Sequence, residues 1–478
     1  ASSGTSGGFA INEDENINYM KNNPNLNLTG RNVIIAIADT GIDYLHPDFI
    51  NADGTSKILY LWDQTKEGNS PEGFYFGTEY TRDDINRAIS ENDSTLSTDE
   101  VGSGTLLSGI CAGLGVSNSL YEGVAKDSEL IVIKLGTIEG KYNNAYYYVA
   151  RDYARKKARE LERPLIINTS VGTNNDVGFI NRATQSTIWY QYGECEIAGI
   201  GNEGNTQTHA SGKISAEGET QTVEIEIEEE EEFLKIELWI CRPDRVNIKI
   251  ISPTGEESKD VGLGYYKNES GIFNFENTTY AVFYVFPTSY SGQEFIIINL
   301  YNASPGIWKI NLTGVYINSG CYNVYLPNRS LINQNTRFLE PDPFYTVNFP
   351  TVDRNIFTVG AYDMINNSMW PPSSRGPNIR NIQKPNIVAP GVNIISAYPH
   401  NRYGNITGTS AAAAVTSGVA ALFLQYVTQN NQYKRQGFTQ SIYSFFQLGA
   451  DREDNIQYPN FIYGYGLLNA RKIFEEFR

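Results

Sequence analysis

Ser410 is placed where local structure would favour a serine nucleophile. It lies in the stretch GTSAAAAVTSGVAAL, Gly408 to Leu422, in which a glycine turn leads into a run of small residues. Small side chains let a helix that begins at the serine pack closely on a sheet, with the positive end of its dipole beside the hydroxyl. The alternative is an N-cap ahead of a core helix, which would carry no chemistry.

Two further polar side chains follow apolar runs. Asp39 ends the run Val33 to Ala38, and Asn202 follows the strand pattern in CEIAGIGNEGN. A run without polar residues is typical of a strand buried on both faces of a parallel sheet, and open α/β sheets place their sites at the C-terminal ends of such strands. Asn202 offers an amide donor there. The alternative role for Asp39 is to open a turn before Gly41.

A second turn bracketed by glycines carries Ser103. In VGSGTLLSGICAG, Gly102 and Gly104 flank this serine, and the apolar positions that follow fit a helix packed on the sheet.

The elements that must position these residues alternate between strand and helix. The patterns predict a short helix within residues 11–30, a strand at 129–134, a helix at about 145–161 and a strand at 165–169. This alternation indicates right-handed βαβ crossovers and a mostly parallel sheet.

From about residue 206 the pattern changes to short strands separated by Gly, Pro, Asn and Asp turns. Glutamate alternates with Val and Ile at 223–228, which suits an edge or half-exposed strand. The α/β pattern returns after about 335. We therefore expect a first α/β part at 1–205, an inserted all-β domain of the jelly-roll type at 206–335, and a second α/β part at 336–478.

Composition excludes several classes of partner. The formal net charge of −17 argues against nucleic acid and anionic membranes, which require a basic face. The chain contains no apolar stretch of about 18 residues, so we expect no membrane span. Residues 1–10 lack the basic and apolar regions of a signal peptide, and we interpret this end as either processed or recombinant.

The cysteines and histidines do not indicate a metal centre. Four cysteines lie far apart with no CxxC pair, and there are three histidines, so we expect neither a zinc cluster nor a dense disulfide framework. Free, mostly buried thiols are the prediction. We assign no cofactor. The acidic loop DSTLSTDE at 93–100 could hold calcium, but solvated carboxylates are the favoured interpretation.

Six sequence blocks together resemble the subtilisin-like serine peptidases. ADTGID and GNEG are similar to the aspartate and oxyanion-asparagine motifs of that family, and GYGLLNA is similar to its closing motif. The blocks SSRGP, KPNIVAPG and GTSAAAA resemble those that lead into its serine. The resemblance implies a three-layer α/β fold with a central parallel sheet and the chain order Asp, His, Ser.

The resemblance also implies roles for individual residues. Asp39 would be the orienting aspartate, Ser410 the nucleophile, and Asn202 an oxyanion donor together with the backbone N–H of Ser410. The segment Ser170, Val171 and Gly172 resembles the edge that pairs with an extended peptide substrate. The implied partner is thus a peptide or protein in an extended-strand groove.

One position departs from the family pattern. The histidine motif Gly-His-Gly-Thr is replaced by Gly102-Ser103-Gly104-Thr105, so Ser103 stands where the general base should be. A serine hydroxyl cannot accept a proton from the nucleophile near neutral pH. We expect no rescue by His46, His209 or His400. Ala414 and Val415, where the family usually has Pro and His, should affect helix packing more than chemistry.

The position of the insert and the local sequence GNEGNTQTHASG resemble those of the Csp germination proteases of anaerobic spore formers. In that group active members cleave the precursor of a spore-cortex hydrolase, and paralogues without triad residues act as pseudoproteases in germinant signalling. The resemblance implies location in the spore and Csp-like partners. It also implies a prodomain, which we do not recognise here and expect to have been removed by another protease or by recombinant truncation.

Three hypotheses of function follow. The first is a pseudoprotease that binds without cleaving. The second is an active endopeptidase whose histidine was changed to Ser103 by engineering. The third is a carbohydrate-binding or structural protein that uses the all-β insert. Its aromatic residues include Trp239, Tyr265, Tyr266 and Trp308, which core packing explains better.

Overall fold

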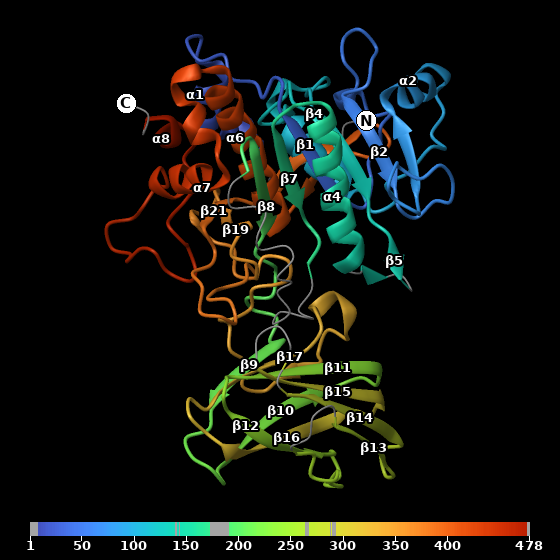
Figure 1. The fold of residues 1–478 in the computed structure, drawn as a ribbon, viewed down its shortest axis with the longest axis vertical. Coiled ribbons are helices and arrows are strands. Elements are labelled where there is room, and N and C mark those ends of the chain that lie inside the picture. The colour runs from blue at the N-terminus through green and yellow to red at the C-terminus, as the bar shows by residue number, and fades with distance from the viewer. Residues whose placement is uncertain are drawn as a thin grey trace.

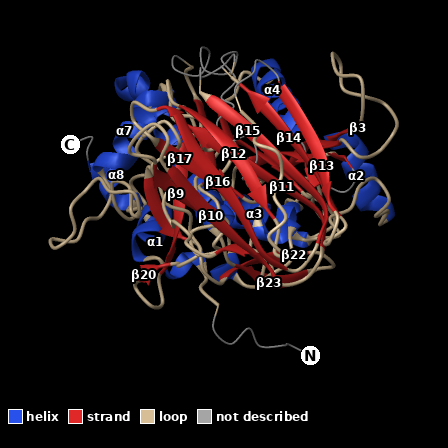
Figure 2. Cartoon of the chain, turned by 90° about the horizontal axis from the view of Figure 1, so that it is seen from below, coloured by secondary structure: helices blue, strands red, loops and turns tan. Residues whose placement is uncertain are grey.

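The chain forms an α/β part and a separate β-sandwich below it (Figure 1). The computed structural model describes residues 8–138, 141–142, 144–172, 191–262, 267–286, 288 and 293–475. Seen from below, the strands of the sandwich lie in front of the helices of the α/β part (Figure 2).

A nine-stranded sheet organises the α/β part, in the order β20-β19-β8-β7-β1-β4-β2-β3, with β21 also paired to β19. Its pairs are parallel except β2–β3 and β19–β20. The strands are β1 (Ile34–Asp39), β2 (Ile58–Asp63), β3 (Thr78–Thr81), β4 (Glu129–Lys134), β7 (Leu165–Thr169), β8 (Glu194–Gly199), β19 (Phe357–Asp363), β20 (Ser368–Met369) and β21 (Ile387–Pro390). The mostly parallel sheet that the sequence predicts is confirmed.

Helices cover both faces of this sheet. The described α-helices are α1 (Glu15–Asn22), α2 (Arg82–Glu91), α3 (Ser103–Ala112), α4 (Asn144–Glu160), α6 (Thr409–Gln429), α7 (Thr439–Leu448) and α8 (Ala470–Glu475). In β1, Ile35 and Ile37 belong to the core cluster formed with α3 and α6. Ile34 and Ala36 belong to the cluster formed with α4. Because alternate residues of one strand face opposite sides, the sheet is the middle of three layers.

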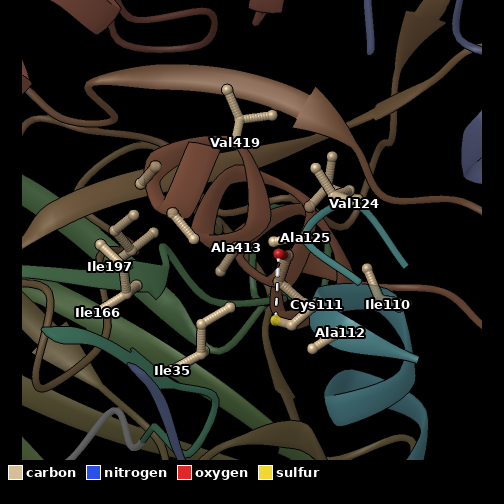
Figure 3. Close-up of a cluster of buried hydrophobic side chains, with 14 of the residues drawn as sticks. Ile35, Ile110, Cys111, Ala112, Val124, Ala125, Ile166, Ile197, Ala413 and Val419 are labelled. Atoms are coloured by element: carbon tan, nitrogen blue, oxygen red, sulfur yellow. Dashed lines mark hydrogen bonds between the residues drawn. The ribbon is translucent and has the colours of Figure 1, made fainter. Parts of the chain in front are cut away.

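The core under α6 is dense with small side chains. Ala411 to Val415 are fully buried, and the Sγ of Cys111 at the end of α3 lies 3.3 Å from the carbonyl oxygen of Ala414. Figure 3 shows Cys111 between α6 and side chains of the sheet such as Ile35 and Ile166. Ala414 and Val415 are among these buried residues, so both side chains contribute to the packing of α6.

The sandwich contains two antiparallel sheets. One has the order β12-β16-β10-β18 and the other β13-β14-β15-β11-β17-β9. The strands are β9 (His209–Lys213), β10 (Thr220–Ile227), β11 (Glu231–Ile240), β12 (Arg245–Ile251), β13 (Lys267–Phe273), β14 (Thr278–Val285), β15 (Glu294–Ala303), β16 (Gly306–Tyr316), β17 (Cys321–Tyr325) and β18 (Arg337–Phe338). From Val223 to Ile227, β10 alternates buried and half-buried residues. It pairs along its whole length with β16, and on its other side at two residues with β18.

The insert packs against the α/β part through an apolar cluster. Trp239 and Phe295 stack with ring centroids 4.1 Å apart, and Tyr325 joins them. Val347 and Phe349, which follow the insert in the sequence, belong to the same cluster. Trp239 and Trp308 are each 1% exposed, so both are core residues, as the packing interpretation predicts. Tyr265 and Tyr266 lie outside the described residues.

Two cysteines correct the expectation of free thiols. Cys241 and Cys321 form a disulfide at the adjoining ends of β11 and β17, across a sequence separation of 80 residues. Cys111 and Cys195 are free and buried, as predicted. The prediction failed for the first pair because the fold brings two distant strand ends together, which spacing alone does not reveal.

One described helix, α6, is long and apolar enough to cross a bilayer. However, 89% of its most apolar 18-residue stretch is buried inside the protein. Such burial is what the core helix of a globular domain shows.

Candidate functional site

The predicted site residues gather at one edge of the central sheet. Asp39 pairs in register with the last residue of β4, and Thr169 at the end of β7 pairs with Ala198 near the end of β8. Since the strands are parallel, their carboxyl ends align. Asp39, Ser170 and Asn202 therefore leave the sheet at the same edge, as α/β sites commonly do.

Asp39 and Ser103 form the first pair of site residues. Asp39 is 3% exposed, its Oδ1 accepts a hydrogen bond from the N–H of Thr40 at 2.8 Å, and its carboxylate interacts with the Ser103 side chain. Burial raises the pKa of Asp39 to about 6, and the hydrogen bonds oppose this rise only in part. The residue in place of the family's base is thus in contact with the aspartate that would orient that base.

Asp99 holds Ser103 in place, a role that the sequence analysis missed. Its Oδ1 accepts from the N–H of Gly102 at 2.7 Å and from the hydroxyl of Thr40 at 2.7 Å. Its Oδ2 accepts from the N–H and the hydroxyl of Thr105 at 2.8 and 2.6 Å. A carboxylate that accepts four hydrogen bonds at a helix N-terminus acts as a cap. Asp99 is 6% exposed, so the interpretation of the acidic loop as solvated is wrong for this residue.

The two glycines around Ser103 are required by geometry. Gly102 has φ +87°, a conformation that favours glycine, and a Cβ there would lie 2.3 Å from the ring of Tyr398. A Cβ on Gly104 would lie 2.0 Å from the carbonyl oxygen of Gly41. These contacts let α3 begin directly against the loop that follows Asp39.

Ser410 and Asn202 form the second group. Ser410 is the second residue of α6, and its Oγ lies 3.3 Å from the carbonyl oxygen of Ser170. The amide oxygen of Asn202 accepts from the N–H and the hydroxyl of Thr409 at 3.1 and 3.0 Å. The amide oxygen of Asn202 therefore faces Thr409, and the NH₂ group of the same carboxamide points away from it.

Ser170 is held by a chain of side-chain hydrogen bonds. Its hydroxyl donates to Asn168 at 3.0 Å, and the Asn168 amide donates to Ser417 of α6 at 3.0 Å. Asn168 is fully buried. The predicted peptide-binding edge and the helix that carries Ser410 are therefore joined through the interior.

A pocket of about 390 Å³ opens beside Ser410. Val171 is the only described apolar side chain in its lining, and the rest is polar or glycine. Its described lining comprises Ser170, Val171, Gly172, Gly199, Gly201, Asn202, Glu203, Thr206, Asn328, Arg329, Ser330, Gln334, Asn348, Thr409 and Ser410. All three residues of the predicted edge and both predicted oxyanion and nucleophile residues thus meet in one cavity, whereas Asp39 and Ser103 are not among its described lining residues.

One wall of this pocket comes from the segment that leaves the insert, which sequence reasoning missed. The Glu203 carboxylate accepts hydrogen bonds from the hydroxyls of Thr206 and Thr208 at 2.6 and 2.9 Å. It also accepts one from the backbone N–H of Arg329 at 3.3 Å. The Arg329 guanidinium donates to the carbonyl oxygens of Asn333 and Thr336, each at 2.8 Å. Glu203 and Arg329 are 126 residues apart, so no local signal links them.

The three histidines have other surroundings. His46 is 1% exposed, with Nδ1 accepting from the Asp48 N–H and Nε2 near the carbonyl oxygen of Arg402 at 2.9 Å. His209 is buried in the insert against Asp342 and Asn323. His400 is exposed, and its backbone N–H donates to Asp43. The rings of His46 and His209 are engaged by these partners, and the expectation that no histidine substitutes at position 103 stays a prediction.

Among the described residues, no group of three or more His, Cys, Asp or Glu side chains is arranged to hold a metal ion. Ser410 at a helix N-terminus, beside a carboxamide and an extended edge, can present a hydroxyl and hydrogen-bond donors to a peptide carbonyl.

Comparison with known proteins identifies the class. The fold is that of an α/β serine peptidase with a β insert, and the subtilase family pattern matches residues 30–227 and 328–466. Because this match covers more than half of the chain, the chain belongs to the subtilase family.

Individual relatives agree with this assignment. The structure of the Clostridium perfringens CspB protease superposes with a TM-score of 0.85 at 25% identity, covering 97% of this chain and 96% of that one. Serine protease AprX of Bacillus subtilis is 34% identical over 26% of this chain and 31% of its own length. Subtilisin of Bacillus sp. strain TA39 is 30% identical over 40% of this chain and 39% of its own. The chain thus matches less than half of the length of these two curated relatives.

Proposed function

We propose that this chain is a subtilase pseudoprotease, which binds a peptide or protein segment in an extended groove without cleaving it. The observation that carries the proposal is Ser103, which stands at the start of α3 in contact with the Asp39 carboxylate. No proton acceptor of suitable pKa replaces the imidazole at that position. In subtilisin, a member of the same family, removal of the histidine lowers turnover by about 10⁶-fold.

Binding is supported by what surrounds Ser410. The edge Ser170 to Gly172 and the pocket beside Ser410 offer main-chain pairing and a subsite for one side chain. We further propose that the bound partner belongs to spore germination signalling, in the spore cortex or coat region. Support comes from the resemblance to the Csp group and from the likeness to the CspB protease over nearly the whole chain.

A fluorophosphonate probe tests this proposal through the reactivity of Ser410. We expect the chain as it stands to be unlabelled by intact mass spectrometry, and Ser103→His to be labelled at a rate at least about 10³-fold higher. The matched control is Ser103→His combined with Ser410→Ala, which should not be labelled. Rapid labelling of the unmodified chain at Ser410 would contradict the proposal, because it would show that the hydroxyl is already activated.

The preserved arrangement of Ser410 and Asn202 favours one alternative, an endopeptidase that processes a cortex-hydrolase precursor and whose histidine was replaced by Ser103. The codon at position 103 in the natural gene separates the two. A histidine codon there would favour the enzyme, and a serine codon the pseudoprotease.

A further inference from the structure

We infer that the pocket beside Ser410 selects an uncharged side chain that forms hydrogen bonds, best of all the carboxamide of glutamine or asparagine, in the residue that pairs with Ser170 to Gly172. This inference rests on the proposed peptide-binding function and specifies which segment the groove accepts.

The two charged side chains of the pocket, Glu203 and Arg329, already form hydrogen bonds within the protein. The Glu203 carboxylate accepts hydrogen bonds from two threonine hydroxyls and from the backbone N–H of Arg329. The Arg329 guanidinium donates to three backbone carbonyls, those of Thr206, Asn333 and Thr336. These two opposite charges lie in one lining and leave it neutral. A lysine, arginine, aspartate or glutamate side chain would lose hydration without gaining a free counter-charge.

The lining is also unsuited to an apolar side chain. Apart from Val171 and the glycines, every described lining residue carries a polar side chain. Filling the pocket with a leucine or phenylalanine side chain would remove water from these groups and replace none of their hydrogen bonds. Because several polar groups of the lining would lose their hydrogen bonds together, their loss offsets the gain from burying one apolar side chain.

One buried group in the lining lacks a partner. The Oδ1 of Asn348 accepts no hydrogen bond, although the residue is only 4% exposed. The backbone of Asn348 is fixed, because its N–H donates to Ile200 at 3.1 Å. Gly201 leaves room for its amide, since a Cβ there would lie 2.6 Å from the Asn348 carboxamide carbon. An acceptor left unpaired beside a cavity is complementary to a ligand that brings a donor.

A carboxamide matches this surface better than a hydroxyl. It carries a donor and an acceptor, so it can pair with Asn348 and with a neighbouring donor of the lining at the same time. A cavity of about 390 Å³ also exceeds what a serine or threonine side chain would fill. Glutamine combines the required length with the required chemistry.

Calorimetric titration of the unmodified chain tests the inference without any need for catalysis. The probes are N-acetylated tetrapeptide amides that differ only in the last residue, which is Gln, Glu, Lys, Leu or Gly. We expect the Gln peptide to bind about tenfold to a hundredfold more tightly than the Leu, Glu and Lys peptides. Asn348→Leu should abolish the preference for Gln over Leu and leave the affinity for the Gly peptide unchanged. Asn405→Leu, an exposed change on another sheet, is the matched control and should alter nothing.

The outcomes are distinguishable from those of the parent proposal. Equal binding of the Gln and Gly peptides would overturn selection by the pocket but keep the groove. Tightest binding of the Leu or Lys peptide would also overturn the inference. If none of the five peptides binds, both the inference and the proposed peptide groove fail. If Asn348→Leu does not fold, the relative affinities of the five peptides for the unmodified chain still test whether the pocket selects glutamine.

Discussion

At the scale of single residues, Asp39 is costly to keep ionised in the folded chain. It is buried, and its pKa is raised from 3.8 to about 6 by desolvation. Between these two values the folded state holds a proton that the unfolded state has released. Stability therefore falls as pH rises through this window, by about 3 kcal/mol in total, and stays lower above it.

Asp39→Asn removes this cost while it keeps an acceptor for Thr40 and Ser103. We expect the variant to be more stable than the parent chain at pH 8 and nearly equal to it at pH 4. Urea unfolding at the two values measures both differences. A variant that is destabilised equally at the two pH values would mean that the buried carboxylate is not responsible.

Most of the candidate site could be predicted at this scale, because its residues stand beside glycines and at the ends of apolar runs. Asp39, Asn202 and Ser410 are each placed at the sheet edge that their neighbours indicate. Asn348 could not be predicted. Its place in the pocket depends on backbone that comes from beyond the insert, so nothing adjacent in sequence marks it.

At the scale of elements, Asp99 is the residue on which the start of α3 depends. Its carboxylate accepts four hydrogen bonds from Thr40, Gly102 and Thr105. We expect Asp99→Ala to destabilise the chain by about 2–4 kcal/mol, since it removes a cap and leaves buried donors unpaired. Denaturant unfolding checks this value.

The neighbouring Glu100→Ala is the control. The Glu100 side chain is 70% exposed and pairs at the surface with Lys134, so the expected change is within about 1 kcal/mol. Equal losses from the two substitutions would argue that the whole loop, and not the cap, is responsible.

Elements of the α/β part are close to their predicted bounds. The strand predicted at 129–134 is β4, the strand at 165–169 is β7, and the helix predicted at about 145–161 is α4 (Asn144–Glu160). Continuous apolar runs and helical periodicity carry this information locally. The disulfide and the pairing of insert strands could not be predicted in this way, because they depend on contacts between distant segments.

At the scale of the whole molecule, the insert and the α/β part share one apolar cluster. Trp239 is 1% exposed and stacks on Phe295 at this junction. We expect Trp239→Ala to cost about 3–5 kcal/mol and to separate calorimetric unfolding into two transitions, since the two parts lose their common packing.

Phe233→Ala is the matched control, because Phe233 lies on the same strand but is 41% exposed. It should leave a single transition close to that of the parent chain. If Trp239→Ala also unfolds in one transition, the two parts are held together mainly by other contacts, such as those of Glu203 and Arg329.

The position of the insert has a consequence for how the chain folds. β8 and β19 are parallel neighbours in the central sheet, although β8 ends at Gly199 and β19 begins at Phe357. Closing so long a loop costs entropy before the strands can pair. Within the insert, His209 near its start pairs with Tyr325 near its end. An insert that folds first brings its two ends together, so that the sheet has only a short remaining gap to close.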